Sequence, residues 1–350
     1  VGLADGDDVA IINATGNNTV FGGAGGDNIT AAAGNDKIYG GDGFDTIAAG
    51  AGNNIVYGGD RDDVITALGG NNTLGGGAGK DTITVTGGAG DNTIYGGLDN
   101  DLITVNAGSG ANTIDGGTGN DTITTSSTGS DKVAGGAGDD NITVSAGSDT
   151  VDGGEGNDTI TSTSTGGDKL NGGAGNDSIT VSGGGSDTVD GGDGNDTIGF
   201  TTTAPASGTT TVALSGGAGD DAITVTAGAG FNATSKLVLT VNGGEGNDAI
   251  DLAAINAGTL SSTVTVDGGA GNDRIVAADL NSTGANSVKY TGGAGNDTFV
   301  FNGATITEGN VGIADIVDFK ANEDKLDLTA IVGVGGVNFA TDVIQVGSDV

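Results

Sequence analysis

The stretch GGAGNDSI at residues 172–179 decides how the rest of the chain is interpreted. It combines two adjacent glycines, a third glycine, an aspartate at the sixth position and an isoleucine at the eighth. This phrase, which we call the strong phrase, occurs fourteen times, with its sixth positions at Asp27, Asp45, Asp63, Asp81, Asp101, Asp121, Asp140, Asp158, Asp177, Asp196, Asp221, Asp248, Asp273 and Asp297. A unit of about nine residues, with two units in each turn of about 18, is typical of a calcium-bound parallel β-roll.

An inward-pointing column accompanies these aspartates. Two residues after each one comes an aliphatic or aromatic residue: Ile29, Ile47, Ile65, Ile83, Ile103, Ile123, Ile142, Ile160, Ile179, Ile198, Ile223, Ile250, Ile275 and Phe299. Because side chains alternate across a strand, the preceding residues, such as Thr46 and Thr82, are expected to point outward. One isoleucine per turn is buried only when turns stack, so the pattern predicts a thin, continuous core.

A weaker phrase with eroded glycines alternates with the strong one and predicts the opposite edge of the roll. Its sixth positions are Asn18, Asp36, Asn54, Asn72, Asn92, Asn112, Asp131, Asp149, Asp168 and Asp187. Its inward residues are Val20, Ile38, Val56, Leu74, Ile94, Ile114, Val133, Val151, Leu170 and Val189. We expect this edge to hold fewer ions, mainly near Asp131 to Asp187 and none beyond Asp196. In the neutral stretch with Asn54, Asn72, Asn92 and Asn112 we expect either amide ladders or partly filled sites.

The period changes after Asp196, where the strong aspartates lie 24 to 27 residues apart. The weaker phrase gives way to longer β-prone segments such as SKLVLTV at 235–241, and Pro205 fits an ordinary loop. We therefore expect three parts: a regular two-edged roll at 1–198, widened turns of about 25 residues with one calcium edge at 199–297, and a C-terminal cap at 298–350.

The composition limits which metal ligands and which partners the chain can have. Acidic residues outnumber basic ones 46 to 10, and the chain has no Cys and no His. Thiolate and imidazole metal sites are therefore excluded, and the remaining oxygen ligands favour calcium. A net charge of −36 argues against nucleic acid as a partner. The sequence contains no apolar run long enough to span a membrane. It starts in register without a signal peptide, so we expect it to be a piece of a longer protein.

Each strong phrase has the parts of a cation site. Tight turns with positive φ need glycine, and such turns aim carbonyl oxygens between neighbouring coils, where the aspartate adds a carboxylate. Fourteen loops leave thirteen gaps, which predicts about thirteen calcium ions on the strong edge. Of the weak edge, Asp36, Asp131, Asp149, Asp168 and Asp187 are candidate ligands. One alternative is that the aspartates only form a solvated acidic face, but this would not explain why they recur in phase with Gly and Ile. Another is that pairs of aspartates act as general acid and base, but an active site is normally unique and these pairs repeat identically.

GGAGNDSI, GGDGNDTI at 191–198 and their relatives resemble the RTX (repeats-in-toxin) nonapeptide, and IVDFKANEDKLDL at 316–328 resembles the segment that commonly follows such repeats. The resemblance covers nearly the whole chain. It implies a right-handed parallel β-roll, calcium in rows between turns, type I export and a secreted or cell-surface location. At two loops, Arg61 and Asp99 replace the third glycine, which puts those sites in doubt.

The sequence predicts an all-β structural protein and not an enzyme, since no site is unique. The first hypothesis is a calcium-dependent extracellular module of a surface layer, filament or adhesin, with calcium and either copies of itself or other cell-surface components as partners. The alternatives are the C-terminal secretion and folding module of a secreted protease or lipase, and a binder of ice or polysaccharide. An aromatic stripe at Phe21, Tyr39, Tyr57 and Tyr95 predicts either a cross-strand ladder or an interaction surface.

Overall fold

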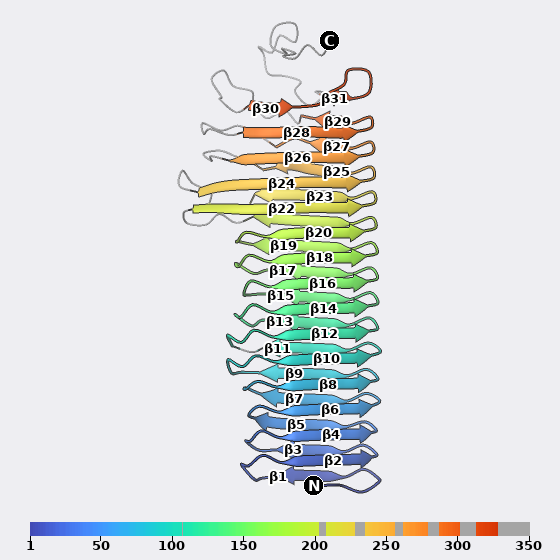
Figure 1. The fold of residues 1–350 in the computed structure, drawn as a ribbon, viewed down its shortest axis with the longest axis vertical. Helices are drawn as coiled ribbons and strands as arrows, with labels where there is room; N and C mark the ends of the chain where they lie inside the picture. The colour runs from blue at the N-terminus through green and yellow to red at the C-terminus, as the bar shows by residue number, and fades with distance from the viewer. Residues whose placement is uncertain are drawn as a thin grey trace.

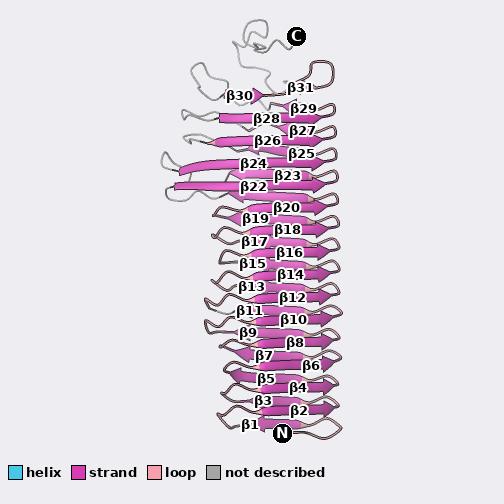
Figure 2. Cartoon of the chain, in the orientation of Figure 1, coloured by secondary structure: helices cyan, strands magenta, loops and turns pink. Residues whose placement is uncertain are grey.

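The computed structural model describes residues 1–106, 108–202, 208–227, 235–255, 262–278, 287–301 and 313–327. In this part of the chain the fold is all-β: parallel strands stack into one elongated roll, with the N-terminus at one end (Figure 1). The described residues form strands and loops only, as Figure 2 shows, and none of them forms a helix that could cross a membrane.

The strands alternate between two long parallel sheets, so that consecutive strands lie in opposite sheets. The first, which we call the odd sheet, has sixteen strands: β1 (Val9–Ile12), β3 (Asn28–Ala31), β5 (Thr46–Ala51), β7 (Val64–Leu68), β9 (Thr82–Thr86), β11 (Leu102–Asn106), β13 (Thr122–Thr125), β15 (Asn141–Val144), β17 (Thr159–Ser162), β19 (Ser178–Gly183), β21 (Thr197–Thr202), β23 (Ala222–Ala227), β25 (Ala249–Ala254), β27 (Arg274–Val276), β29 (Thr298–Val300) and β31 (Lys325–Asp327).

The second, the even sheet, contains fifteen strands: β2 (Thr19–Ala24), β4 (Lys37–Asp42), β6 (Ile55–Asp60), β8 (Thr73–Ala78), β10 (Thr93–Leu98), β12 (Thr113–Thr118), β14 (Lys132–Ala137), β16 (Thr150–Glu155), β18 (Lys169–Ala174), β20 (Thr188–Asp193), β22 (Gly208–Ala218), β24 (Ser235–Glu245), β26 (Thr263–Ala270), β28 (Ser287–Ala294) and β30 (Ile313–Ile316). Each strong phrase links an even strand to the next odd strand, and each weak phrase links an odd strand to the next even one.

The core is the pair of aliphatic columns that the repeat predicts. Equivalent residues pair across neighbouring strands in register, as Ile142 does with Ile160 and Ile160 with Ile179. Every member of the strong column is at most 1% exposed, and every member of the weak column at most 3%. The predicted columns are therefore confirmed. Each turn contributes two large apolar side chains that only the adjacent turns can cover.

The turns widen where the sequence period lengthens. Strands β22 and β24 have eleven residues each, whereas β20 has six. The added positions bring further buried residues into the core, including Val212, Leu237 and Leu239. The predicted loop at Pro205 and most of the predicted cap lie outside the described residues. What is described of the cap, β30 and β31, continues both sheets. The division into three parts stays a prediction.

The aromatic stripe forms a ladder on the outer face of the even sheet. The rings of Phe21 and Tyr39 stack with centroids 5.1 Å apart, and those of Tyr39 and Tyr57 with centroids 5.7 Å apart. A Cβ atom added at Gly75 would lie 2.9 Å from Cδ1 of Tyr57, so this ring leans over the glycine that interrupts the stripe. The contacts fit the ladder interpretation. Whether the stripe also binds a partner stays open.

The core column yields a stability prediction. Ile160→Asp places an unpaired carboxylate among fully buried aliphatic side chains, so the free energy of unfolding in calcium should fall by about 4 kcal/mol or more. The control is Thr159→Asp, which adds the same charge to the exposed neighbouring position and should change stability by about 0.5 kcal/mol. Denaturant unfolding of both variants in calcium measures the difference, and equal losses would contradict the assigned alternation.

Candidate calcium-binding edges

A continuous ladder of backbone-to-carboxylate hydrogen bonds runs along the strong edge. The backbone N–H of each strong aspartate donates to Oδ1 of the strong aspartate one turn later, as Asp140 does to Asp158 and Asp158 to Asp177. From Asp27 to Asp297 these distances lie between 2.7 and 3.0 Å. All fourteen predicted residues are thus brought into one row, each buried to within a few per cent.

The second carboxylate oxygen in this row lacks a protein partner. Oδ2 is buried and accepts no hydrogen bond in thirteen of the fourteen strong aspartates: Asp27, Asp45, Asp63, Asp81, Asp101, Asp121, Asp140, Asp158, Asp177, Asp196, Asp221, Asp248 and Asp273. A buried anionic oxygen without a partner is costly, and the cost repeats in every turn unless a cation or a proton neutralises the oxygen. The partnerless Oδ2 atoms are therefore candidate cation ligands.

Glycines keep the space around these oxygens open. A Cβ atom at the first glycine of a strong loop, for example Gly153, would collide with Oδ2 of Asp158 and with the carbonyl oxygen of Gly172 in the next turn. The second glycine, Gly154, adopts a φ of 116°, which side chains rarely accept. At the third position, Arg61 and Asp99 keep the left-handed conformation with φ of 80° and 70°, so these two loops hold the turn at a conformational cost.

The donor set fits calcium. Each gap between strong loops offers a buried aspartate oxygen and backbone carbonyls from glycine turns, all of them hard oxygen ligands. Among the described residues no three carboxylate, imidazole or thiol groups gather into one cluster, so an ion would take most of its ligands from carbonyls. Calcium bound there would supply the positive charge that the aspartate row lacks.

Burial changes the acidity of the row. Loss of hydration raises the pKa of Asp63, Asp101, Asp140 and Asp221 to about 7, against a normal value of 3.8. The backbone N–H of the preceding aspartate lowers each of these pKa values in part, and neighbouring carboxylates raise them further. Calcium must therefore displace protons, which makes its binding depend on pH.

Asparagine side chains supply hydrogen bonds along much of the weak edge. The same backbone ladder links its sixth positions, with distances of 2.7 to 3.2 Å from Asn18 to Asp187. In addition, Nδ2 of Asn92 donates to the carbonyl of Gly90 and to Oδ1 of Asn112. Asn72 and Asn112 make equivalent bonds. Amide hydrogens thus reach the carbonyls that would otherwise face a cation, as the predicted amide ladder requires.

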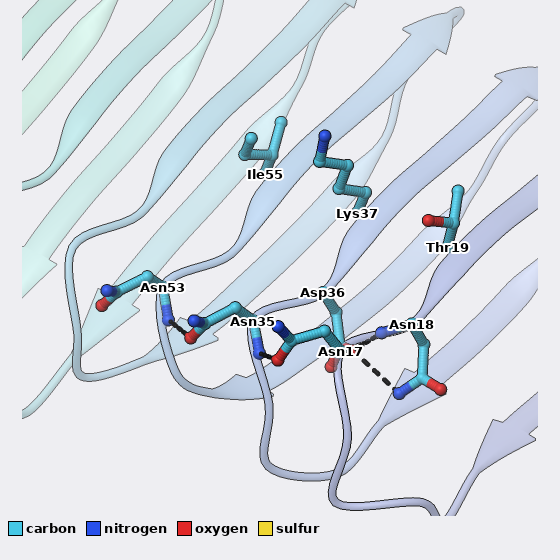
Figure 3. Close-up of a pocket in the computed structure, with 8 residues that line it drawn as sticks. All are labelled: Asn17, Asn18, Thr19, Asn35, Asp36, Lys37, Asn53 and Ile55. Atoms are coloured by element: carbon cyan, nitrogen blue, oxygen red, sulfur yellow. Dashed lines mark hydrogen bonds between the residues drawn. The ribbon is translucent and has the colours of Figure 1, made fainter.

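A hollow at the start of the weak edge shows this arrangement together with an outer ladder (Figure 3). The backbone N–H of Asn35 donates to Oδ1 of Asn17, and that of Asn53 donates to Oδ1 of Asn35. Deeper in the wall, Asn18 donates through both its backbone and its amide nitrogen to Oδ1 of Asp36. Oδ2 of Asp36 is buried without a partner, so this turn keeps one acceptor for a cation.

The later weak edge is uneven. Oδ2 of Asp149 is buried without a partner, as in the strong row. By contrast, Thr125 donates its hydroxyl proton to Oδ2 of Asp131, and Ser162 does the same for Asp168. These hydroxyls satisfy carboxylates that were predicted to hold ions, and the sequence alone gave no reason to expect them. Calcium at Asp131, Asp149, Asp168 and Asp187 stays a prediction, with the geometry favouring Asp149.

Both ends of the strong row include residues that the repeat search missed. The backbone N–H of Asp8 donates to Oδ1 of Asp27, and that of Asp297 donates to Oδ1 of Asp324. At the C-terminal end, the two carboxylate oxygens of Asp318 accept the N–H groups of Gly292 and Gly293. The available signal was an aspartate two residues before an aliphatic one, as in Asp324-Lys325-Leu326, but neither end has the full set of glycines.

The fold and the site together define a parallel β-roll with a glycine-rich loop and a buried aspartate at each turn of its strong edge. A family model described as the RTX calcium-binding nonapeptide repeat matches residues 13–47, 49–83, 84–108, 104–128, 125–160 and 162–198, which cover just over half of the chain. The chain belongs to this family. The model for the peptidase M10 serralysin C terminal matches residues 226–350. Both models describe non-catalytic modules, and they indicate a calcium-dependent β-roll of an extracellular protein exported by type I secretion.

Two further comparisons give no information on the function of the chain. The chain is similar to the X-ray crystal structure of a hyperactive, Ca²⁺-dependent, beta-helical antifreeze protein from an Antarctic bacterium, with 20% sequence identity and a TM-score of 0.36. That match covers 87% of this chain and 86% of the other, and at this level it carries no argument about function. The search of curated proteins found no match.

Replacing one loop glycine tests the geometry of the strong edge. Gly153→Ala puts a methyl group against Oδ2 of Asp158, so the variant should bind one or two fewer calcium ions and lose about 2 kcal/mol of stability in calcium. Gly199→Ala is the matched control, because its new Cβ would have no neighbour closer than 3.9 Å. Native mass spectrometry counts the ions. Full calcium loading of Gly153→Ala would argue against this cation position.

The raised pKa values predict how the ion-free roll responds to pH. Folded aspartates near 7 bind protons that unfolded aspartates near 3.8 have released, so folding without calcium is favoured at low pH and weakens as pH rises between about 4 and 7. Circular dichroism of metal-stripped protein should show the β-signal decline over this range, and calcium should restore it at pH 7. A β-signal that grows with pH in the absence of calcium would contradict this prediction.

Proposed function

We propose that the chain is a calcium-dependent structural module of an extracellular surface layer, filament or adhesin, which folds on secretion into a calcium-loaded β-roll. The observation that carries this proposal is the unbroken row of buried, partnerless Oδ2 atoms from Asp27 to Asp273. Such a row makes the fold itself the response to calcium. The repeated sites stiffen a long rod and leave no single residue to perform a unique reaction.

The location of folding follows from the strength of such sites. Extracellular calcium modules bind in the range of about 10⁻⁴ to 10⁻³ M, far above the calcium concentration of the cytosol. The chain would therefore stay expanded by its net charge of −36 inside the cell, in a form that export requires. Outside the cell, calcium would neutralise the aspartate row and allow the two core columns to stack.

A second function has an observation in its favour. The match of residues 226–350 to the serralysin C terminal suits a secretion and folding module attached to a larger secreted enzyme, such as a protease or lipase. Against it stands the length of the roll, which in the described residues stacks both sheets from β1 to β31. The two functions predict different observations. A structural module would be found on the cell surface, whereas a module of an enzyme would be part of a protein that turns over a substrate.

The proposal predicts folding that depends on calcium and a graded response to lost sites. The wild-type chain should lose its β-signal in excess chelator at pH 7 and regain it in millimolar calcium. Asp158→Ala removes the partnerless Oδ2 together with the acceptor of the Asp140 backbone N–H, so it should lower stability in calcium by a few kcal/mol (about 2 to 4) and leave the remaining turns folded. The control Asp190→Ala removes an exposed carboxylate on the even sheet and should leave stability nearly unchanged.

Circular dichroism and calcium titration measure both effects. The same β-signal in chelator and in calcium would refute the structural proposal. A single residue within the chain whose replacement abolishes turnover of a substrate, with the fold intact, would favour the enzymatic alternative.

A further inference from the structure

Charge is distributed unequally between the two faces of the roll. The twelve strands of the odd sheet from β1 to β23 contain no charged residue. The even sheet carries outward charges along its length: Lys37, Asp115, Lys132, Asp152, Lys169, Asp190, Lys236 and Asp267. In a chain with a net charge of −36, an uncharged face of this length is a pronounced asymmetry.

Threonines cover this uncharged face. We call the outward side of strands β3 to β23 the threonine face. Its central row is unbroken over seven turns, and its members pair in register across the odd sheet: Thr66, Thr84, Thr104, Thr124, Thr143, Thr161 and Thr180. A flanking row adds Thr82, Thr122, Thr159, Ser178 and Thr197, with Leu102 and Asn141 between them. All these side chains are exposed or half-exposed.

The hydroxyl groups of the central row have almost no partners within the chain. Thr66 donates to the carbonyl of Ile47 at 3.4 Å. Within the described part of the chain, the other six central hydroxyls have no hydrogen bond, although the structure satisfies Thr125 and Ser162 on the neighbouring weak edge. Methyl and hydroxyl groups therefore repeat at the strand spacing of about 4.8 Å on a surface that no other part of the described chain covers.

We propose that the threonine face is the contact surface between copies of this chain. This inference deepens the proposed structural function and rests on it. Two rolls that met at their loops or at their even sheets would have to desolvate charged side chains, whereas the threonine face brings none into the contact. This face is therefore where two rolls approach at the lowest electrostatic cost. Two such faces can interdigitate, because identical β-branched side chains in register form dry interfaces between sheets.

The size of the face suits a stable dimer. Eleven strands at about 4.8 Å, each presenting about five residues at about 3.3 Å, give a surface of roughly 870 Å² per copy. Two copies would then bury about 1,700 Å², which is within the standard size of a specific protein–protein interface. Salt should strengthen the contact, since it screens the repulsion between the rest of the two rolls.

The test places charge on this face and compares it with the opposite face. In millimolar calcium, sedimentation velocity across a concentration series should show wild-type dimers or larger assemblies. The triple variant Thr104→Glu, Thr143→Glu and Thr180→Glu should weaken self-association by about tenfold or more, because like charges would meet in the interface. The control variant Thr113→Glu, Thr150→Glu and Thr188→Glu makes the same charge change on the even sheet and should associate like the wild type.

Circular dichroism in calcium accompanies each measurement, so that loss of association is separated from loss of folding. A wild-type chain with a full β-signal that remains monomeric at every concentration overturns the contact and leaves the proposed calcium-dependent function standing. Association weakened equally by both triple variants, or by neither, places the contact elsewhere and also overturns it. A monomer that instead adsorbs to ice or to an insoluble polysaccharide through this face overturns it in favour of that occupant.

Discussion

The rest of the structure depends on one electrostatic constraint, the stacking of a carboxylate above a carboxylate at every turn of the strong edge. The backbone hydrogen bond to Oδ1 fixes each aspartate in place, as between Asp140 and Asp158, but it also brings the next negative charge within one strand spacing. Burial then raises the pKa of both residues, to about 7 and about 6, because neither can keep its hydration. The fold thus contains a row of carboxylates that its own side chains do not neutralise, which is why we propose that folding depends on calcium.

On the weak edge, amide and hydroxyl groups of the protein donate hydrogen bonds where the strong edge has partnerless carboxylate oxygens. Asn92 supplies amide hydrogens where the strong edge needs a cation, and Thr125 supplies a hydroxyl proton to Asp131. Both solutions keep the same backbone ladder, so the turn geometry does not itself require an ion. An internally satisfied edge can stay in register without a cation at each of its turns. On the proposed function, the strong edge is the part of the roll that responds to calcium.

The sequence was sufficient for the fold and for placing the strong aspartates in one row because the repeat couples three signals in one phase. Glycine marks the turn, aspartate the ligand and isoleucine the core, and the structure confirms the positions of all three in loops such as 172–179. It was insufficient where one signal stands alone. Asp318 and Asp324 hold the end of the strong row without the flanking glycines, and Ser162 reaches Asp168 through a turn that no repeat position encodes. Side-chain rotamers and local turns decide those contacts, and a periodic pattern contains no information about them.

The ends and faces of the roll follow from the same constraint as its edges. In the loop between β30 and β31, Asp318 accepts the N–H groups of Gly292 and Gly293, so that these backbone donors are satisfied by a carboxylate. Carboxylates therefore serve as backbone acceptors both in this loop and along the strong row, where the second oxygen has no protein partner. Because negative charge is concentrated in the loops and on the even sheet, the odd sheet from β1 to β23 is left free of it. A rod that confines its charges in this way keeps one long face on which contact with another surface costs little electrostatic energy.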